Sequence, residues 1–233
     1  MHDLQVHASD VIFGISPVWF AGSLFLLTYI LIITERLNRA VIAMTAAALM
    51  ILSGVLTQEA AVHGVDFNTI GLLTGMMIIV AITRQSGVFQ YLAIRSAKLV
   101  NADPWGILVM LVLVTALLSA LLDNVTTVLL IAPITLLITD TLKISAYPYL
   151  FAEIFASNIG GTATLIGDPP NIMIGSATGL GYNDFLFNLA PIAVLILIAT
   201  LLPIYLIWGR KLEADPALMD KVMKYRERDA IKD

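Results

Sequence analysis

The amino-acid sequence predicts an all-α polytopic membrane protein with five transmembrane helices, a re-entrant hairpin and a broken helix. Its composition is 59% hydrophobic and only 13% charged, with a mean hydropathy of +0.90, whereas soluble domains average about 25% charged residues. Long apolar runs recur along the 233 residues. Two of the apolar stretches are interrupted by a short polar segment, and these interruptions predict the hairpin and the broken helix.

The apolar runs define the expected spans, because a helix of about 20 apolar residues crosses a hydrocarbon core of about 30 Å. Uninterrupted spans are expected at about 17–34, 40–56, 69–83 and 185–208. The interrupted stretch 148–177 supplies the fifth crossing. Residues 85–101 are interpreted either as an amphipathic helix at the membrane interface or as a continuation of the third span. Residues 1–211 therefore form a membrane domain, and 212–233 a charged cytoplasmic tail or linker.

The basic residues indicate the orientation of the chain. Most of the 13 Lys and Arg residues follow the first, third or last span, and two lie within 85–101. The remaining one, Lys143, follows the apolar stretch 105–138. The connections 1–16, 57–68 and 178–184 contain none. Because cytoplasmic loops carry the excess of Lys and Arg, the N-terminus is expected outside and the C-terminus in the cytoplasm. The plasma membrane is the expected location.

Two apolar limbs within 105–138 meet at the sequence LLDNVTTV. They form either a re-entrant hairpin or two tight crossings, and both alternatives leave the orientation of later segments unchanged. Polarity at the junction favours the hairpin, because two full crossings need about 40 residues plus a loop. The polar side chains of this tip are Asp123, Asn124, Thr126 and Thr127.

The sequence SNIGGTATLIGDPPN, residues 157–171, interrupts the fifth span. The pair Gly160-Gly161 costs about 1 kcal/mol per glycine in a helix, and proline breaks a continuous helix, so the helix is expected to stop within this segment. Asp168 before Pro169 has the form of an N-cap and predicts a second half-helix. Irregular backbone at membrane depth is tolerated only in a protein-lined site or wet cavity, so the break predicts a binding site.

The candidate site combines the hairpin tip with the interrupted helix. Carboxylates, hydroxyls and carbonyls suit a cation, and half-helix N-termini suit an anion. The predicted ion- or substrate-binding residues are Asp123, Asn124, Thr126, Thr127, Ser157, Asn158, Gly160, Gly161, Thr162, Thr164, Asp168 and Asn171, and a sodium ion is expected at Asp123, Asn124, Ser157 and Thr162. An alternative role for both aspartates is to cap the helices that follow them.

The odd number of crossings has a topological consequence. A duplicated copy after residue 233 would start on the opposite side of the membrane and would be inverted, as in many secondary transporters. The chain is therefore interpreted as one inverted-repeat half. The expected partners are membrane lipid, a small ion or anion, and a second inverted repeat from a fused or separate chain.

The segments LLDNVTTVLLIAPITL and AEIFASNIGGTATLIGDPPNI resemble the two signature segments of the ion transporter superfamily that contains arsenite permeases, D-type sodium/proton antiporters, citrate-type carriers and the P protein. The P-protein-like branch is the most similar. The resemblance covers about 17–211, the first of two repeats, and implies a secondary transporter that works as a homodimer. It places Asp123, Asn124 and Thr126 where related carriers have a Ser-Asn-Thr tip, and residues 157–164 on the unwound loop. The aspartate at the first tip position favours a cation or proton over a carboxylate substrate.

We therefore expect an ion-coupled secondary transporter and no enzymatic activity. The alternatives are a sodium/proton antiporter, a channel-like anion pathway, or a scaffold subunit. An intramembrane aspartyl protease is disfavoured because Pro169 breaks the helix that such an enzyme needs. With no cysteine there is no disulfide or thiolate metal site; no cofactor is expected beyond Na⁺ or H⁺ as coupling ion, and no nucleic-acid partner.

Overall fold

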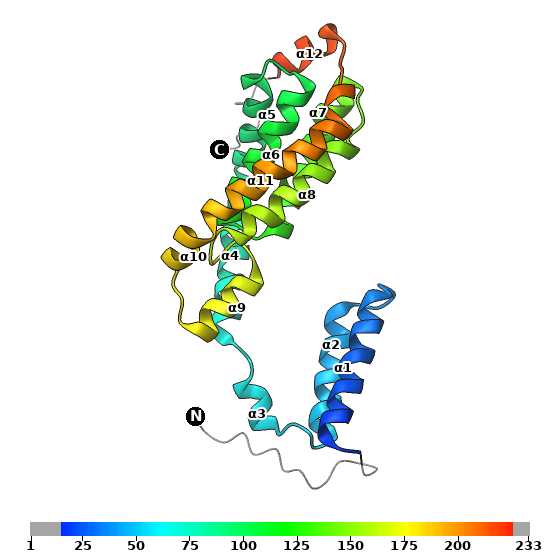
Figure 1. The fold of residues 1–233 in the computed structure, drawn as a ribbon, viewed down its shortest axis with the longest axis vertical. Coiled ribbons are helices and arrows are strands. Elements are labelled where there is room, and N and C mark those ends of the chain that lie inside the picture. The colour runs from blue at the N-terminus through cyan, green and yellow to red at the C-terminus, as the bar shows by residue number, and fades with distance from the viewer. Residues whose placement is uncertain (1–14, 226–233) are drawn as a thin grey trace. The chain divides into compact units, whose positions relative to one another are not determined.

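The computed structural model describes residues 15–225, and every regular element among them is a helix. The chain divides into two compact units, one ending at Asp66 and one beginning at Phe67. In the first unit, α1 (Pro17–Ile33) packs against α2 (Arg39–Leu52), and the short α3 (Gln58–His63) follows. Figure 1 shows both units.

The second unit contains the predicted site. Its helices are α4 (Phe67–Gln85), α5 (Val88–Leu99), α6 (Pro104–Leu121), α7 (Asn124–Leu142), α8 (Tyr147–Thr162), α9 (Pro169–Thr178), α10 (Tyr182–Asn188), α11 (Ala190–Ile207) and α12 (Pro216–Met223), with a 3-10 turn at Gly209–Lys211. Helix α8 packs against α6, α7 and α11, and Figure 1 shows it running beside α11. The buried core contains Ile107 and Leu111 of α6 and Ile131 and Ile138 of α7.

The helices are those of an integral membrane protein. Four of those described, α4, α6, α7 and α11, are long and apolar enough to cross a membrane, and α1 and α2 are shorter apolar helices. Large apolar side chains such as Leu117, Leu129 and Ile198 are more than half exposed, as expected for surfaces that face lipid rather than water. The predicted all-α polytopic fold is confirmed.

Several expected boundaries need correction. The second span ends at Leu52 and not at 56, because Gly54 turns the chain with a φ of 76°. The last span begins at Ala190 and not at 185, since the preceding residues form the separate helix α10. Pro191 fits the first turn of α11, where its missing N–H costs no hydrogen bond.

Residues 85–101 form their own helix and do not continue the third span. Gly87 has a φ of 75° and separates α4 from α5, a conformation that glycine adopts at little cost. The apolar face of α5 buries Phe89 and Ala93 and packs against α6 and α7. The alternative of a continuous third span is therefore wrong.

Part of the C-terminal segment 212–233 is helical. Helix α12 packs against α5 and α7, and its Val222 is fully buried. The hydroxyls of Tyr225 and Thr141 lie 2.7 Å apart. Residues 226–233 lie outside the described part of the chain.

The two limbs of the expected hairpin are α6 and α7, with 18 and 19 residues. At about 1.5 Å per residue, each limb is close to the thickness of a hydrocarbon core, so each is longer than a helix that ends at mid-membrane. Helix length therefore does not favour the re-entrant hairpin over two crossings, and both alternatives remain.

Candidate functional site

The tip, residues 122–127, is closed by bonds within itself. Helix α6 ends at Leu121, and Asp123 occupies the N-cap position of α7. Its Oδ1 accepts a hydrogen bond from the backbone N–H of Thr126 at 2.8 Å, and its carbonyl accepts from Thr127 Oγ1 at 2.9 Å. The Asn124 side chain accepts from the next backbone N–H, that of Val125, at 2.8 Å. The capping role considered for Asp123 is therefore present.

The helix break lies further along the chain than the glycine pair suggests. Helix α8 continues through Gly160 and Gly161 to Thr162, and the irregular backbone is confined to residues 163–168, here called the unwound segment. The helix stops within 157–171 as expected, but residues 157–162, which the resemblance placed on the unwound loop, are helical. The expected restart at Pro169, the first residue of α9, is confirmed.

The glycines serve close helix packing. A Cβ atom at Gly160 would lie 2.2 Å from the carbonyl oxygen of Ala116 on α6, and one at Gly161 would lie 2.7 Å from the carbonyl oxygen of Gly167. Any side chain at Gly160 would force α8 away from α6. The propensity cost of about 1 kcal/mol per glycine is therefore offset by contacts that only a bare backbone permits.

Hydrogen bonds to α6 and from α9, and one within the segment, hold the unwound segment. The hydroxyl of Thr164 donates to the carbonyl of Ala120 on α6 and accepts from the backbone N–H of Gly167 at 3.2 Å. On α9, Asn171 Nδ2 is within 2.8 Å of the Thr164 carbonyl and within 3.3 and 3.4 Å of the carbonyls of Thr162 and Gly161. These bonds meet the requirement that buried carbonyls be paired.

The tip and the broken helix meet. Asn124 Nδ2 donates to the Asn158 Oδ1 at 3.2 Å, and the Ser119 hydroxyl near the end of α6 donates to the carbonyl of Ser157 at 2.6 Å. The negative charge of Asp123 acts on the carboxyl group of Asp168. The two interruptions thus form one polar region.

Asp168 differs from Asp123 in its bonding. It occupies the N-cap position of α9, but its side chain accepts no capping hydrogen bond. The residue is half-buried. The segments 119–127 and 157–171 contain no Lys, Arg or His to balance either aspartate. The region is therefore electronegative.

The four side chains expected to hold sodium do not share one surface. Ser157 is buried and Thr162 is exposed, since five residues along a helix correspond to a rotation of about 140°. Both hydroxyls donate to carbonyls of their own helix, those of Ile154 and Ile159. Among the described residues there is no group of three or more His, Cys, Asp or Glu that could hold a metal ion.

Sequence reasoning missed the contribution of α6. Ser119 and the carbonyls of Ala116 and Ala120 line the broken helix, although they lie in an apolar stretch that gives no motif. The available signal was Ser119 itself, a polar residue one helical turn before Asp123.

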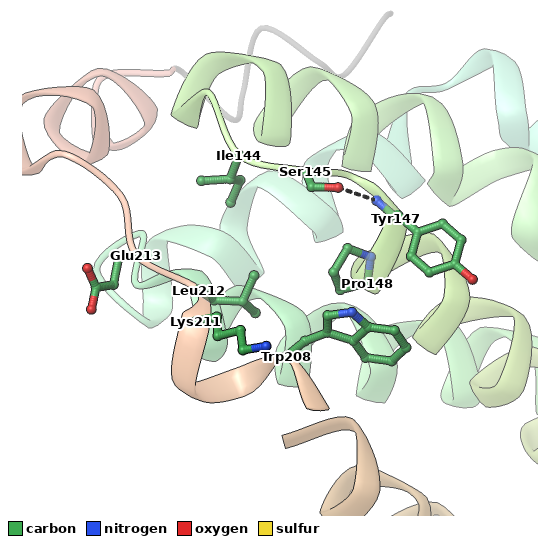
Figure 2. Close-up of a pocket in the computed structure, with 8 residues that line it drawn as sticks. All are labelled: Ile144, Ser145, Tyr147, Pro148, Trp208, Lys211, Leu212 and Glu213. Carbon is green, nitrogen blue, oxygen red and sulfur yellow. Dashed lines mark hydrogen bonds between the residues drawn. The ribbon is translucent and has the colours of Figure 1, made fainter. Parts of the chain in front are cut away.

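A separate pocket lies at the opposite end of α8. It has a volume of about 330 Å³, and Tyr147, Pro148, Trp208 and Lys211 are among its lining residues (Figure 2). The rings of Tyr147 and Trp208 are 5.9 Å apart. Aromatic and basic side chains together are typical of a membrane–water interface. No predicted site residue lines this pocket.

Comparisons with known proteins agree with this architecture. A family model described as a citrate transporter matches residues 29–232. A "46 kDa membrane protein" of Mycobacterium leprae is 48% identical over 219 residues, which are 91% of this chain and 51% of that protein. An uncharacterized transporter of Mycobacterium tuberculosis is 48% identical over 218 residues, 91% of this chain and 50% of that protein.

The human P protein is a more distant relative, 38% identical over 208 residues, which are 84% of this chain and 25% of the P protein. The chain thus spans about half the length of the mycobacterial relatives and a quarter of the P protein. The resemblance inferred from the two signature segments is confirmed by these matches.

Proposed function

Since this chain belongs to the citrate transporter family, we propose that it forms the first repeat of an ion-coupled secondary transporter whose ion site lies between the tip and the unwound segment. Membrane transport is supported by the family and by relatives that are named transporters. The structural support is the meeting of two chain interruptions, linked by Asn124 and Asn158, beside two aspartates with no basic side chain in either segment.

The charge of this region favours a cation as the coupling ion. Two carboxylates near each other repel unless a proton or a metal cation lies between or on them, and ionisable groups at membrane depth are usually kept for ion pathways. Asp168 is the stronger candidate ligand, because its side chain makes no capping bond, whereas Asp123 Oδ1 already accepts from Thr126. Asn124 and Asn158 add amide oxygens at the same place; each already accepts one hydrogen bond and keeps a second lone pair.

Sodium/proton exchange is the second candidate function, and the same pair of aspartates favours it. Free citrate carries only negative charge, and no Lys, Arg or His in 119–127 or 157–171 would receive it. Vesicle assays separate the candidates: uptake of an added labelled ion driven by a sodium or proton gradient supports the first, and sodium-dependent proton movement without any further substrate supports the second.

The aspartates are tested by charge removal at constant shape. In the complete transporter, with the second repeat supplied, Asp168→Asn and Asp123→Asn are expected to abolish the sodium or pH dependence of transport while the protein still folds. Asparagine caps a helix about as well as aspartate, so an exclusively capping role makes the opposite forecast. Unchanged sodium and pH profiles in both variants would overturn the ion-site proposal.

The second repeat is part of the proposal, because one tip and one broken helix supply half of a pseudo-symmetric site. We expect the complete transporter to contain an inverted second repeat and to work as a homodimer. This chain alone, reconstituted in vesicles, should show no saturable uptake. Uptake at the rate of a complete relative would contradict the need for a second repeat.

A further inference from the structure

Glu153 is a buried acidic side chain that the tip and the unwound segment do not use. It lies on α8 and is 0% exposed. The Thr135 hydroxyl of α7 donates to its Oε1. Its Oε2 is buried and has no hydrogen-bond partner among the described residues. The Oε1 atom of Glu153 therefore has a hydrogen-bond donor, and the Oε2 atom has none.

No cationic side chain neutralises Glu153 from the helices packed around it. Helix α6 carries no titratable side chain, and α11 carries only Tyr205. On α7 the only titratable side chain is Asp140, which is exposed and pairs with Lys143 at 2.9 Å. The other titratable side chains of α8 are Tyr147, which is exposed, and Tyr149, whose hydroxyl donates to the Pro104 carbonyl at 2.9 Å.

The aspartates that cap neighbouring helices bring negative charge only. They are Asp103 before α6 and Asp123 before α7. An ionised carboxylate without a partner is among the most costly groups to bury, and in practice such a group takes up a proton instead. A neutral carboxylic acid with one unpaired oxygen costs far less. The surroundings of Glu153 therefore fit a protonated side chain.

Buried polar groups lie between Glu153 and the proposed ion site. Ser157 follows it by one helical turn, about 6 Å along the axis, and is 1% exposed. The Ser157 carbonyl accepts from Ser119, one turn before the tip. On α7, Thr127 lies in the tip, and Thr127 and Thr135 are both fully buried. Polar side chains therefore lie buried on α7 and α8 between the tip and Glu153.

We propose that Glu153 is a second ion site, specific for a proton and separate from the aspartates of the tip and the unwound segment. In the packed state the proton stays on the carboxyl group. When α8 and α7 separate enough to admit water, the O–H bond breaks, the proton passes to water on the open side, and the carboxylate remains until a proton from the other side replaces it. The coupling of this cycle to transport rests on the proposed function, whereas the protonation of Glu153 does not.

Infrared spectroscopy tests the protonation without any transport assay. The chain is purified in lipid with ¹³C-labelled glutamate, so that the C=O band of a protonated glutamic acid shifts from that of aspartic acid. The chain has five glutamates. Glu35, Glu59 and Glu213 are exposed, and Glu227 lies outside the described residues. At neutral pH we expect one labelled protonated-acid band, present in Glu213→Gln and absent in Glu153→Gln.

The same variants give the decisive outcomes. Glutamine keeps the shape and neutrality of a protonated glutamate, so Glu153→Gln should unfold at the same temperature as the parent chain. Absence of the band from the parent chain, its persistence in Glu153→Gln, or its loss on adding sodium at constant pH would overturn the proposal. The last result would identify a sodium site instead of a proton site.

A transport measurement then tests the coupling. In the complete transporter, Glu153→Gln should remove one proton-dependent step and flatten the pH profile, while Glu213→Gln keeps it. If the band is assigned to Glu153 and transport in Glu153→Gln keeps its pH profile, the coupling role is wrong. If the complete transporter moves no ion at all, the proposed function fails while the band still reports on Glu153.

Discussion

The tip and the unwound segment are the two breaks in the helices of the site, and different bonds hold them. In the tip, Asp123 accepts from Thr126 and Thr127, three and four residues away. In the unwound segment, Thr164 donates to a carbonyl 44 residues away on α6, and Asn171 of α9 donates to the Thr164 carbonyl. The tip is closed locally, whereas the unwound segment depends on neighbouring elements.

This difference follows from how each break arises. A turn between two helices can be closed by the cap of the second helix. A break within one span leaves the last carbonyls of the first half without partners, and at membrane depth water does not replace them. We therefore expect the tip to keep its shape when helices move, and the unwound segment to change shape whenever α6 moves against α8.

The largest expected effect comes from separating α6 from α8 beside the unwound segment. Gly160→Ala places a Cβ atom 2.2 Å from the Ala116 carbonyl oxygen, and overpacking of this kind costs about 3 kcal/mol. The free energy of unfolding in detergent, measured by denaturant titration, should fall by that amount. Transport by the complete protein should fall with it.

Gly71→Ala is the matched control for this prediction. Gly71 is an exposed glycine of α4, and a Cβ atom there meets nothing within 4 Å. The substitution should raise the free energy of unfolding by up to about 1 kcal/mol, the helix-propensity difference. If Gly160→Ala behaves like Gly71→Ala, the close approach of α6 and α8 does not support the unwound segment.

A smaller effect is expected from removing the amide that holds the unwound segment. Asn171→Ala leaves the carbonyl of Thr164 without its 2.8 Å donor and also removes the longer contacts to Gly161 and Thr162. An unsatisfied buried acceptor costs about 1–3 kcal/mol, so we expect a loss of about 2 kcal/mol. Asn188→Ala, which removes an exposed amide bonded within α10, should change stability little; equal losses would contradict the special role of Asn171.

The sequence predicted the parts of the site that depend on neighbouring residues. Asp123 at a helix start and Pro169 at a helix restart follow from local chemistry and were found where expected. The place of the helix stop was not predictable, because whether Gly160 breaks a helix or lets it pack depends on Ala116 of another helix. Ser119 was missed for the same reason, since its partner is 38 residues away.

The boundaries of the expected interfacial helix and of the last span could not be predicted from the sequence either. A single glycine, Gly87, decides whether α5 continues α4, and its left-handed backbone is not evident from an amphipathic pattern. The division between α10 and α11 lies within a continuous apolar run, 185–208, so hydropathy alone cannot locate it. The presence and approximate position of the apolar helices were predictable, and the helix boundaries that depend on backbone conformation were not.

The smallest effect compares the two aspartates directly. Asp123→Ala removes the Oδ1 atom that accepts from the backbone N–H of Thr126 at 2.8 Å. The free energy of unfolding should fall by about 1 kcal/mol, the usual cost of losing an N-cap. Asp123→Asn should restore it. Asp168→Ala removes no capping bond and takes away a carboxylate repelled by Asp123, so stability should stay constant or rise. An equal loss in Asp123→Ala and Asp168→Ala would show that both aspartates are caps, and the unwound segment would then be closed as locally as the tip.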